Sequence, residues 1–177
     1  MTQQKVVLDE DEIRRTLVRI AHEIVEKNPD GRVALVGIHT RGAVLCRRLH
    51  TLVGELSGAE VPLGDLDISF YRDDVATRSA STQPVVHASH VDFPVEEATI
   101  VLVDDVLYTG RTVRAAIDAL FDYGRPKRVQ LAVLADRGHR ELPIRPDYVG
   151  KNLPTRRDEA VDVHDDGVDL GDMVPRR

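Results

Sequence analysis

The chain has 177 residues, of which 42% are hydrophobic and 31% are charged, a composition typical of a globular protein that buries its core in one domain. Its single cysteine excludes an intrachain disulfide, and neither a signal-like apolar segment nor a run of membrane-spanning length is visible, so we expect a cytoplasmic protein. The formal net charge of −6 does not favour nucleic-acid binding, although an acidic protein can carry a local basic face.

The first half of the chain alternates between predicted helices and strands. Asp9 and Glu12 have the spacing of a capping box, and Ile and Leu then recur on one helical face as far as Ile24. The apolar run 32–38 is typical of a buried strand, and a Leu-rich helix follows the short loop 39–42. Residues 67–71 alternate as a strand does.

The second half continues this pattern after a gap. Residues 73–95 have no hydrophobic periodicity, which predicts a long loop. Strands are predicted at 99–103 and 129–135 with a helix between them, and the acidic tail 158–177 predicts a flexible or weakly ordered end. The alternation indicates an α/β fold with a central, mostly parallel sheet flanked by helices. Such sheets bind ligands at the carboxyl ends of their strands, where 39–42, 104–112 and 136–140 fall.

Two adjacent aspartates end the strand 99–103, and a Thr-Gly-Arg-Thr turn then opens a helix. Paired carboxylates need partners, while a helix N-terminus offers N–H groups that suit a phosphate. A ribose 5-phosphate satisfies both, with its phosphate near Gly110 and its 2- and 3-hydroxyls donating to Asp104 and Asp105. The alternative is an ordinary capped helix after a strand.

The stretch 100–112, IVLVDDVLYTGRT, resembles the phosphoribosyl-pyrophosphate motif of type I phosphoribosyltransferases. The resemblance implies their fold, with a small hood, and a reaction in which a nucleobase nitrogen displaces pyrophosphate from the anomeric carbon. It makes Asp104 and Asp105 catalytic residues. Mg²⁺ would be held mainly through phosphoribosyl pyrophosphate and water, without a dedicated set of protein ligands. The implied substrate-binding residues are Val106, Leu107, Tyr108, Thr109, Gly110, Arg111 and Thr112.

The same resemblance places a pyrophosphate loop at Thr40, Arg41 and Gly42, for which a plain strand-to-helix turn is the alternative. His39 stands where close relatives often have Lys. A mobile lid is implied at about 72–95, with Arg72 as a catalytic cation that contacts pyrophosphate. A solvated arginine at a strand end is the alternative for Arg72.

The segment after the strand 129–135 predicts an irregular hood, at about 136–160, within a single domain. In 6-oxopurine members of the superfamily, Asp and Lys stand at the positions of Tyr108 and Asp136, so hypoxanthine and guanine are disfavoured. A small base contacted largely by the hood backbone fits better, with Asp136 and Arg137 at that subsite.

Together with GIHTRG, SFYRDD and VDDVLYTGRTVRA, the hood is similar to that of bifunctional pyrimidine operon regulatory proteins with uracil phosphoribosyltransferase activity. The likeness runs from Val7 to about Thr155. That family makes UMP and pyrophosphate from uracil and phosphoribosyl pyrophosphate. It also binds the leader mRNA of pyrimidine genes when uridine nucleotides occupy the pocket, and it suggests a homodimer or a higher homo-oligomer.

Basic residues on two segments are candidates for an RNA face, and a solvated helix face is the alternative reading. The candidates are Arg15, Arg19, His22 and Lys27 on the first helix, and His139, Arg140 and Arg145 in the hood. Three functions stay open: an enzyme making UMP that is also a UMP-sensing regulator, a phosphoribosyltransferase for another base such as xanthine or orotate, and a regulator with vestigial catalysis.

Overall fold

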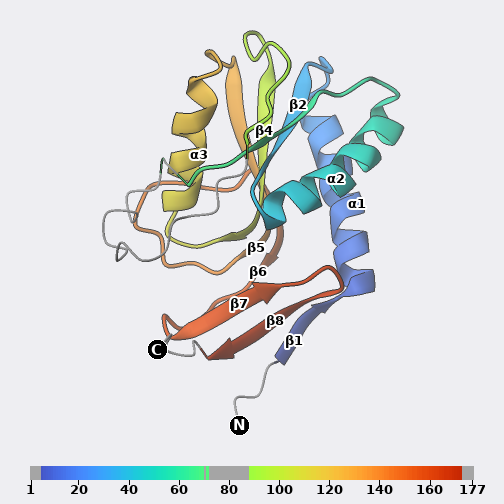
Figure 1. Ribbon diagram of the computed structural model, residues 1–177. Helices are drawn as coiled ribbons and strands as arrows, with labels where there is room; N and C mark the ends of the chain where they lie inside the picture. Colours follow the sequence, from blue (N-terminus) through green and yellow to red (C-terminus); the bar gives the residue numbers. More distant parts are fainter. Residues whose placement is uncertain (1–4, 70, 72–87, 173–177) are drawn as a thin grey trace.

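The computed structural model describes residues 5–69, 71 and 88–172, and it contains two sheets (Figure 1). Within the described ranges, the main sheet has five parallel strands in the order β3-β2-β4-β5-β6. They are β2 (Val33–Ile38), β3 (Leu63–Leu66), β4 (Thr99–Leu107), β5 (Arg128–Asp136) and β6 (Tyr148–Asn152). The second sheet is antiparallel, in the order β1-β8-β7, and consists of β1 (Lys5–Asp9), β7 (Glu159–Val163) and β8 (Gly167–Asp172).

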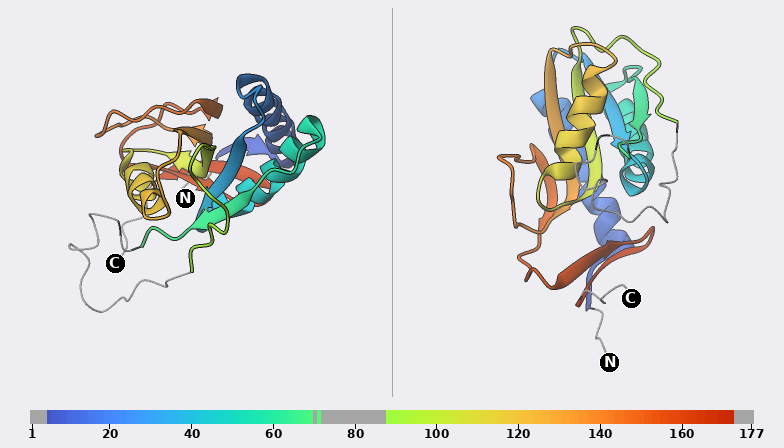
Figure 2. Two further views of the ribbon diagram at one scale, coloured as in Figure 1. Left: turned by 90° about the horizontal axis from the view of Figure 1, so that it is seen from above. Right: turned by 60° about the vertical axis from the view of Figure 1, so that its left-hand side comes forward.

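Among the described residues, three helices cover the two faces of the main sheet: α1 (Glu10–Lys27), α2 (Arg41–Ser57) and α3 (Arg111–Phe121). Helices α1 and α2 lie on one face and α3 lies on the other (Figure 2). Because side chains alternate along each strand, β4 contributes Val101 and Val103 to the first core and Ile100 and Leu102 to the second. The predicted α/β fold with a parallel sheet is therefore confirmed.

Helix α1 begins where the sequence predicts. The Asp9 carboxylate accepts a hydrogen bond from the Glu12 amide at 2.8 Å, and the Glu12 side chain accepts one from the Asp9 amide at 2.9 Å. This capping box satisfies two N–H groups at the helix start. The predicted apolar stripe is buried against the sheet and α2.

The strand predicted at 67–71 is misplaced, because β3 occupies Leu63–Leu66. Asp67 explains the early end: its carboxylate accepts hydrogen bonds from both the amide and the hydroxyl of Ser69, at 2.9 and 2.6 Å. These side-chain hydrogen bonds hold the backbone after Asp67 in a turn, which ends the strand.

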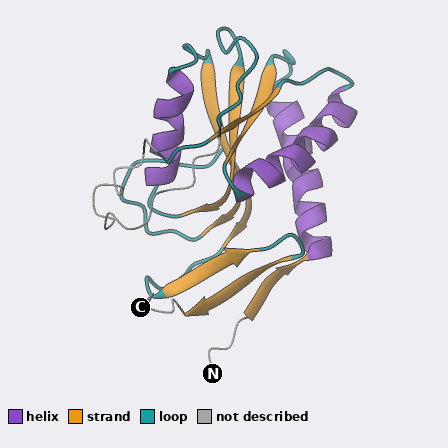
Figure 3. Ribbon diagram, in the orientation of Figure 1, coloured by secondary structure: helices purple, strands orange, loops and turns teal. Residues whose placement is uncertain are grey.

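The prediction of a flexible or weakly ordered tail is wrong for residues 159–172, which form the hairpin β7–β8 beneath the main sheet (Figure 3). Val163 pairs with Val168 across the hairpin, and both are buried with Leu8 of β1 in the core that α1 covers. The prediction of one irregular hood at 136–160 is also wrong in part. Residues Tyr148–Asn152 extend the main sheet as β6, and Glu159 begins β7.

The segment predicted as a mobile lid lies mostly outside the described residues, and so does Arg72. Its described end is not lid-like, because Val91 and Val95 are buried in the core beneath α3. No helix in the described parts of the chain is long and apolar enough to cross a membrane.

Candidate active site

The two predicted catalytic aspartates lie on β4, near its carboxyl end and not beyond it as predicted. Asp104 is buried, at 7% exposure, and its carboxylate accepts a hydrogen bond from the Asp105 amide at 2.9 Å. The Asp105 carboxylate accepts one from the Val106 amide at 2.7 Å. Hydrogen bonds from N–H groups stabilise carboxylates in their ionised form. The carboxyl end of the central strand therefore carries two adjacent acids held by the backbone.

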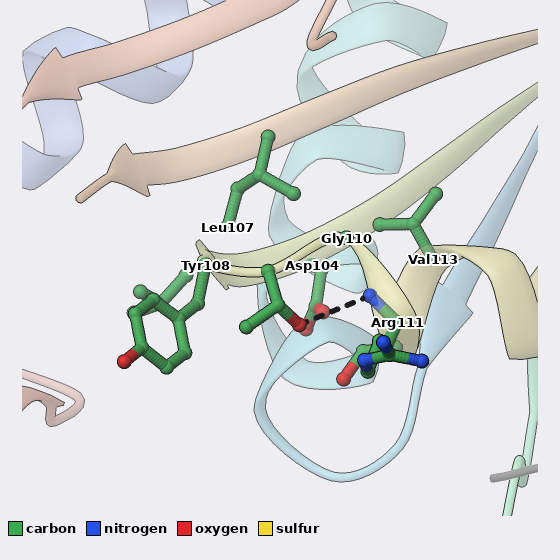
Figure 4. Close-up of a pocket in the computed structure, with 9 residues that line it drawn as sticks. Asp104, Leu107, Tyr108, Gly110, Arg111 and Val113 are labelled. Carbon is green, nitrogen blue, oxygen red and sulfur yellow. Dashed lines mark hydrogen bonds between the residues drawn. The ribbon is translucent and has the colours of Figure 1, made fainter. Parts of the chain in front are cut away.

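A cavity of about 250 Å³ lies between this strand end and the start of α3 (Figure 4). The helix begins directly after Gly110, whose φ of +93° is a left-handed conformation that favours glycine. The Arg111 amide donates to the Thr109 hydroxyl at 3.3 Å, the bond dashed in Figure 4. The first turn of a helix has N–H groups without partners in the helix and a partial positive charge, which suit an anion. The cavity is lined by Asp104 and by Val106, Leu107, Tyr108, Thr109, Gly110, Arg111, Thr112 and Val113.

The segment after β5 supports the predicted phosphate loop 109–112. The Thr109 carbonyl accepts hydrogen bonds from the amides of Glu141 and Leu142, at 2.9 and 3.1 Å. A Cβ added at Gly110 would lie 3.1 Å from Ile144, so the segment packs directly on the glycine. Sequence reasoning did not find these supporting contacts, since they join residues more than 30 positions apart.

Asp136 and Arg137, predicted to bind substrate, make contacts within the chain. The Asp136 carboxylate accepts from the Arg140 guanidinium at 2.6 Å and from the Gly138 amide at 3.0 Å. The Arg137 side chain is buried, stacks 4.1 Å from the centre of the Tyr108 ring and donates to the Glu159 carbonyl at 2.6 Å. Both side chains therefore organise the wall of the site.

The predicted pyrophosphate loop meets the acid pair. A Cβ added at Gly42 would lie 2.5 Å from the Val103 carbonyl oxygen and 3.1 Å from Asp104 Oδ1, so only glycine allows this approach. Arg41 begins α2, and its guanidinium is 3.0 Å from the carboxylate of Asp165, in the turn between β7 and β8. Both partners are well exposed, so this ion pair is weak in water and open to exchange for a bound anion.

One residue near this loop was not predicted. Asp65 of β3 accepts a hydrogen bond from the His39 ring at 2.7 Å, and its position at the carboxyl end of a parallel strand is the signal that could have identified it.

The basic residues predicted for RNA binding divide into two groups. Some are engaged within the chain: Arg19 donates to the carbonyls of Val149 and Gly150, at 3.1 and 2.8 Å, and Lys27 lies 3.3 Å from Asp147. These contacts set α1 alongside β6, which brings the first helix and the hood segment onto one side of the molecule.

The hood residues show the same division. The Arg140 guanidinium donates to the carbonyls of Tyr108 and Ile144, both at 2.8 Å, besides its ion pair with Asp136. A ring nitrogen of His139 lies 2.6 Å from the Thr155 carbonyl oxygen. The exposed members of the predicted RNA face are Arg15, Arg19, His22, Lys27 and Arg145, of which Arg19 and Lys27 make the contacts described above.

No cluster of three or more His, Cys, Asp or Glu side chains within the described ranges is arranged to hold a metal ion. The acid pair nevertheless provides carboxylate oxygens, the donors that Mg²⁺ prefers, and Mg²⁺ usually keeps several waters and substrate oxygens. The site therefore suits a magnesium ion carried mainly by a phosphorylated substrate.

Comparison with known proteins agrees with this geometry. Residues 3–166 match the phosphoribosyl transferase domain family. The bifunctional protein PyrR of Roseiflexus sp. strain RS-1 is 59% identical over 159 residues, 89% of this chain and 86% of that protein. The proteins of that name from Listeria welshimeri and Deinococcus radiodurans are 56% and 55% identical over 171 residues, covering 96% and 94% of this chain and 93% and 92% of theirs.

Solved structures agree on the fold. A hypoxanthine phosphoribosyltransferase of Trypanosoma cruzi has a TM-score of 0.72 at 19% identity, with 95% of this chain and 96% of that one covered. A hypoxanthine-guanine phosphoribosyltransferase of Bacillus anthracis has a TM-score of 0.71 at 14% identity, with coverages of 98% and 99%. At these identities the likeness establishes the type I phosphoribosyltransferase fold alone. The curated relatives go further, and with the matched domain they show that the chain belongs to the PyrR family of bifunctional phosphoribosyltransferase-fold proteins.

Proposed function

We propose that this chain is a uracil phosphoribosyltransferase, which makes UMP and pyrophosphate from uracil and phosphoribosyl pyrophosphate, and that it is also a UMP-sensing, RNA-binding regulator of pyrimidine genes. The observation that carries the proposal is the contact of Gly42 with Asp104. This contact places the loop 40–42, which suits a diphosphate, against an acid pair that suits a ribose diol. The start of α3, which suits a phosphate, lies beside them.

Each part of the substrate then has a place in the reaction. The amides around Gly110 hold the 5-phosphate, and Asp104 and Asp105 accept hydrogen bonds from the ribose hydroxyls. Thr40, Arg41 and Gly42 hold the diphosphate that leaves. Positive charge develops on the ribose ring as the bond to pyrophosphate breaks, and the acid pair stabilises it.

Magnesium would supply charge neutralisation on the leaving diphosphate. The ion would be held mainly by substrate and water, and Asp104 and Asp105 would be the protein groups that help to hold it.

Uracil is the proposed base because the Asp136 carboxylate is already occupied by Arg140 and by the Gly138 amide. A base in this subsite would meet mainly backbone groups, which suits a small pyrimidine. Xanthine and orotate are the alternative substrates. The test is to incubate the protein with Mg²⁺, phosphoribosyl pyrophosphate and each base in turn. UMP formation is expected, whereas consumption of a purine alone would contradict the assignment.

The regulatory half of the proposal is supported by the common side that α1 and the hood segment share, where Arg15, His22 and Arg145 are exposed. Binding of the leader mRNA of pyrimidine genes should tighten when UMP is present, as a titration at physiological salt would measure. No effect of UMP would remove the sensor role and leave an enzyme. A homodimer or higher homo-oligomer and a cytoplasmic location remain predictions.

A further inference from the structure

Asp65 joins two histidines from separate parts of the chain. Its Oδ1 atom is 2.7 Å from His39 Nε2 and 3.2 Å from His90 Nδ1. The backbone of Asp65 also exchanges two hydrogen bonds with that of His90, at 2.8 and 2.9 Å. One carboxylate, 25% exposed, therefore links β3 both to the end of β2 and to the segment that precedes Val91.

His39 is the first residue of the loop that reaches the site. Its amide donates to the Leu66 carbonyl at 3.0 Å, so both its backbone and its ring are bound to β3. Three residues later, Gly42 lies against Asp104. The loop 39–42 is thus fixed at one end by β3, through His39, and at the other by β4.

Neither Asp65 nor His39 is needed as a direct ligand in this arrangement. The Asp65 carboxylate would repel a diphosphate. The Nε2 atom of the His39 ring is already bound to this carboxylate. A hydrogen bond with an ionised partner is stronger and better directed than a neutral one, which suits a role in holding a loop in place. The same pairing gives the His39 side chain a structural role in holding the loop.

We propose that Asp65 is a positioning residue for the transfer reaction, acting through His39 to hold the loop 39–42 in the conformation that receives the diphosphate. This inference rests on the proposed function. It concerns how the loop is held, and it assigns no substrate contact to either side chain.

Initial-rate kinetics of UMP synthesis test the proposal, with phosphoribosyl pyrophosphate as the varied substrate. In Asp65→Asn, the KM for this substrate should rise about tenfold, equivalent to about 1.4 kcal/mol, while kcat changes less than twofold. His39→Ala, which leaves no donor for the carboxylate, should reproduce the effect. The double variant should be no worse than either single one, because both changes disrupt one interaction. Asp65→Glu, which keeps the carboxylate, should recover most of the affinity.

His90→Gln is the matched control, because it removes the other partner of the same oxygen and leaves His39 in place. It should leave the KM within twofold of the wild type. Additive effects of Asp65→Asn and His39→Ala, or an equal rise in KM in His90→Gln, would overturn the proposal.

Amide hydrogen exchange of the substrate-free protein separates this proposal from the proposed function. Asp65→Asn should speed exchange at residues 39–42 and leave α3 unchanged. Unchanged exchange at 39–42 would overturn the positioning role even in an active enzyme. A wild-type protein that makes no UMP would contradict the proposed function instead, and the exchange data would still show whether Asp65 holds the loop.

Discussion

Asp104 and Asp105 show how single residues prepare the site. Both carboxylates accept backbone hydrogen bonds from the residue that follows them, and Asp104 is nearly inaccessible to water. Their orientation is therefore set before any ligand arrives, and in the proposed reaction this would lower the entropy cost of aligning a ribose.

Replacing both acids by amides, in Asp104→Asn with Asp105→Asn, should lower kcat/KM for UMP synthesis at least about 100-fold. Asparagine keeps an oxygen acceptor for the backbone amides, so the fold should survive, as circular dichroism would check. Asp118→Asn, an exposed position on α3, is the control and should retain full activity. Loss of folding in the double variant would mean that the carboxylates are structural.

Cys46 illustrates a buried group with no part in the chemistry. Burial raises the pKa of its thiol well above the ordinary 9.0, and this effect exceeds the lowering by the nearby Arg47 charge. The folded state thus favours the neutral thiol. Burial of the neutral thiol contributes fully to the free energy of unfolding below pH 9.0, and this contribution is lost as the pH rises further.

The free energy of unfolding should accordingly fall more steeply above pH 9.0 in the wild type than in Cys46→Ala, by at most about 1.4 kcal/mol per pH unit. Urea titrations at several pH values measure the difference between the two proteins. Parallel pH profiles would show that the thiol ionises equally in both states.

At the scale of elements, the site depends on the close approach of α2 to β4. Gly42 stands in the first turn of α2, directly against the backbone of Val103 and Asp104. A side chain there would push the helix start away from the acid pair.

Gly42→Ala should therefore raise the Kd for phosphoribosyl pyrophosphate more than about tenfold, because a Cβ would lie 2.5 Å from the Val103 oxygen. Gly54→Ala is a matched control in the same helix, where a Cβ would meet no atom within 4 Å. It should leave the Kd unchanged and stabilise the fold by up to about 1 kcal/mol. Calorimetric titration of both variants measures the contrast, and equal Kd values for the two would contradict the role of Gly42.

The elements that were predictable from the sequence are those with local signals. The apolar runs of β2, β4 and β5 and the capping box of α1 are readable within a few residues. Strand β6 was missed because Gly150 interrupts its apolar pattern. Its pairing with β5 also joins residues far apart in the sequence, since Tyr148 pairs with Ala132, 16 positions away. The hairpin β7–β8 did carry a signal, since valines alternate around Asp166–Gly167, a typical turn pair.

The site follows the same division. The proximity of the acid pair and the predicted phosphate loop was predictable because they form one continuous motif. The contacts of Arg137 with Glu159, of Arg41 with Asp165 and of Asp65 with His39 join distant segments, so only the folded chain reveals them.

At the scale of the whole molecule, α1 and the hood segment present basic residues on the side of the molecule that they share. Arg140 belongs to the predicted RNA face and also contacts the wall of the site, because it bonds Asp136 and the Tyr108 carbonyl to the hood. The exposed Arg15 and Arg145 are better candidates for contacts with RNA phosphates.

Arg15→Ala with Arg145→Ala should weaken RNA binding and lower the slope of log K against log salt by about 1 to 2, while UMP synthesis stays unchanged. Arg140→Ala should impair both activities, because it disturbs the wall of the site. Arg125→Ala, an exposed change after α3, is the control. Filter binding at several salt concentrations measures the slope, and an equal loss of both activities in the Arg15 and Arg145 variant would argue against a separate RNA face.

A crystal structure of the protein with phosphoribosyl pyrophosphate and Mg²⁺ tests the central claim most directly. The 5-phosphate should lie on the amides around Gly110, the ribose hydroxyls on Asp104 and Asp105, and the diphosphate on residues 40–42. A substrate bound with its 5-phosphate away from Gly110, or with its ribose hydroxyls turned from the acid pair, would contradict the account of both catalysis and nucleotide sensing.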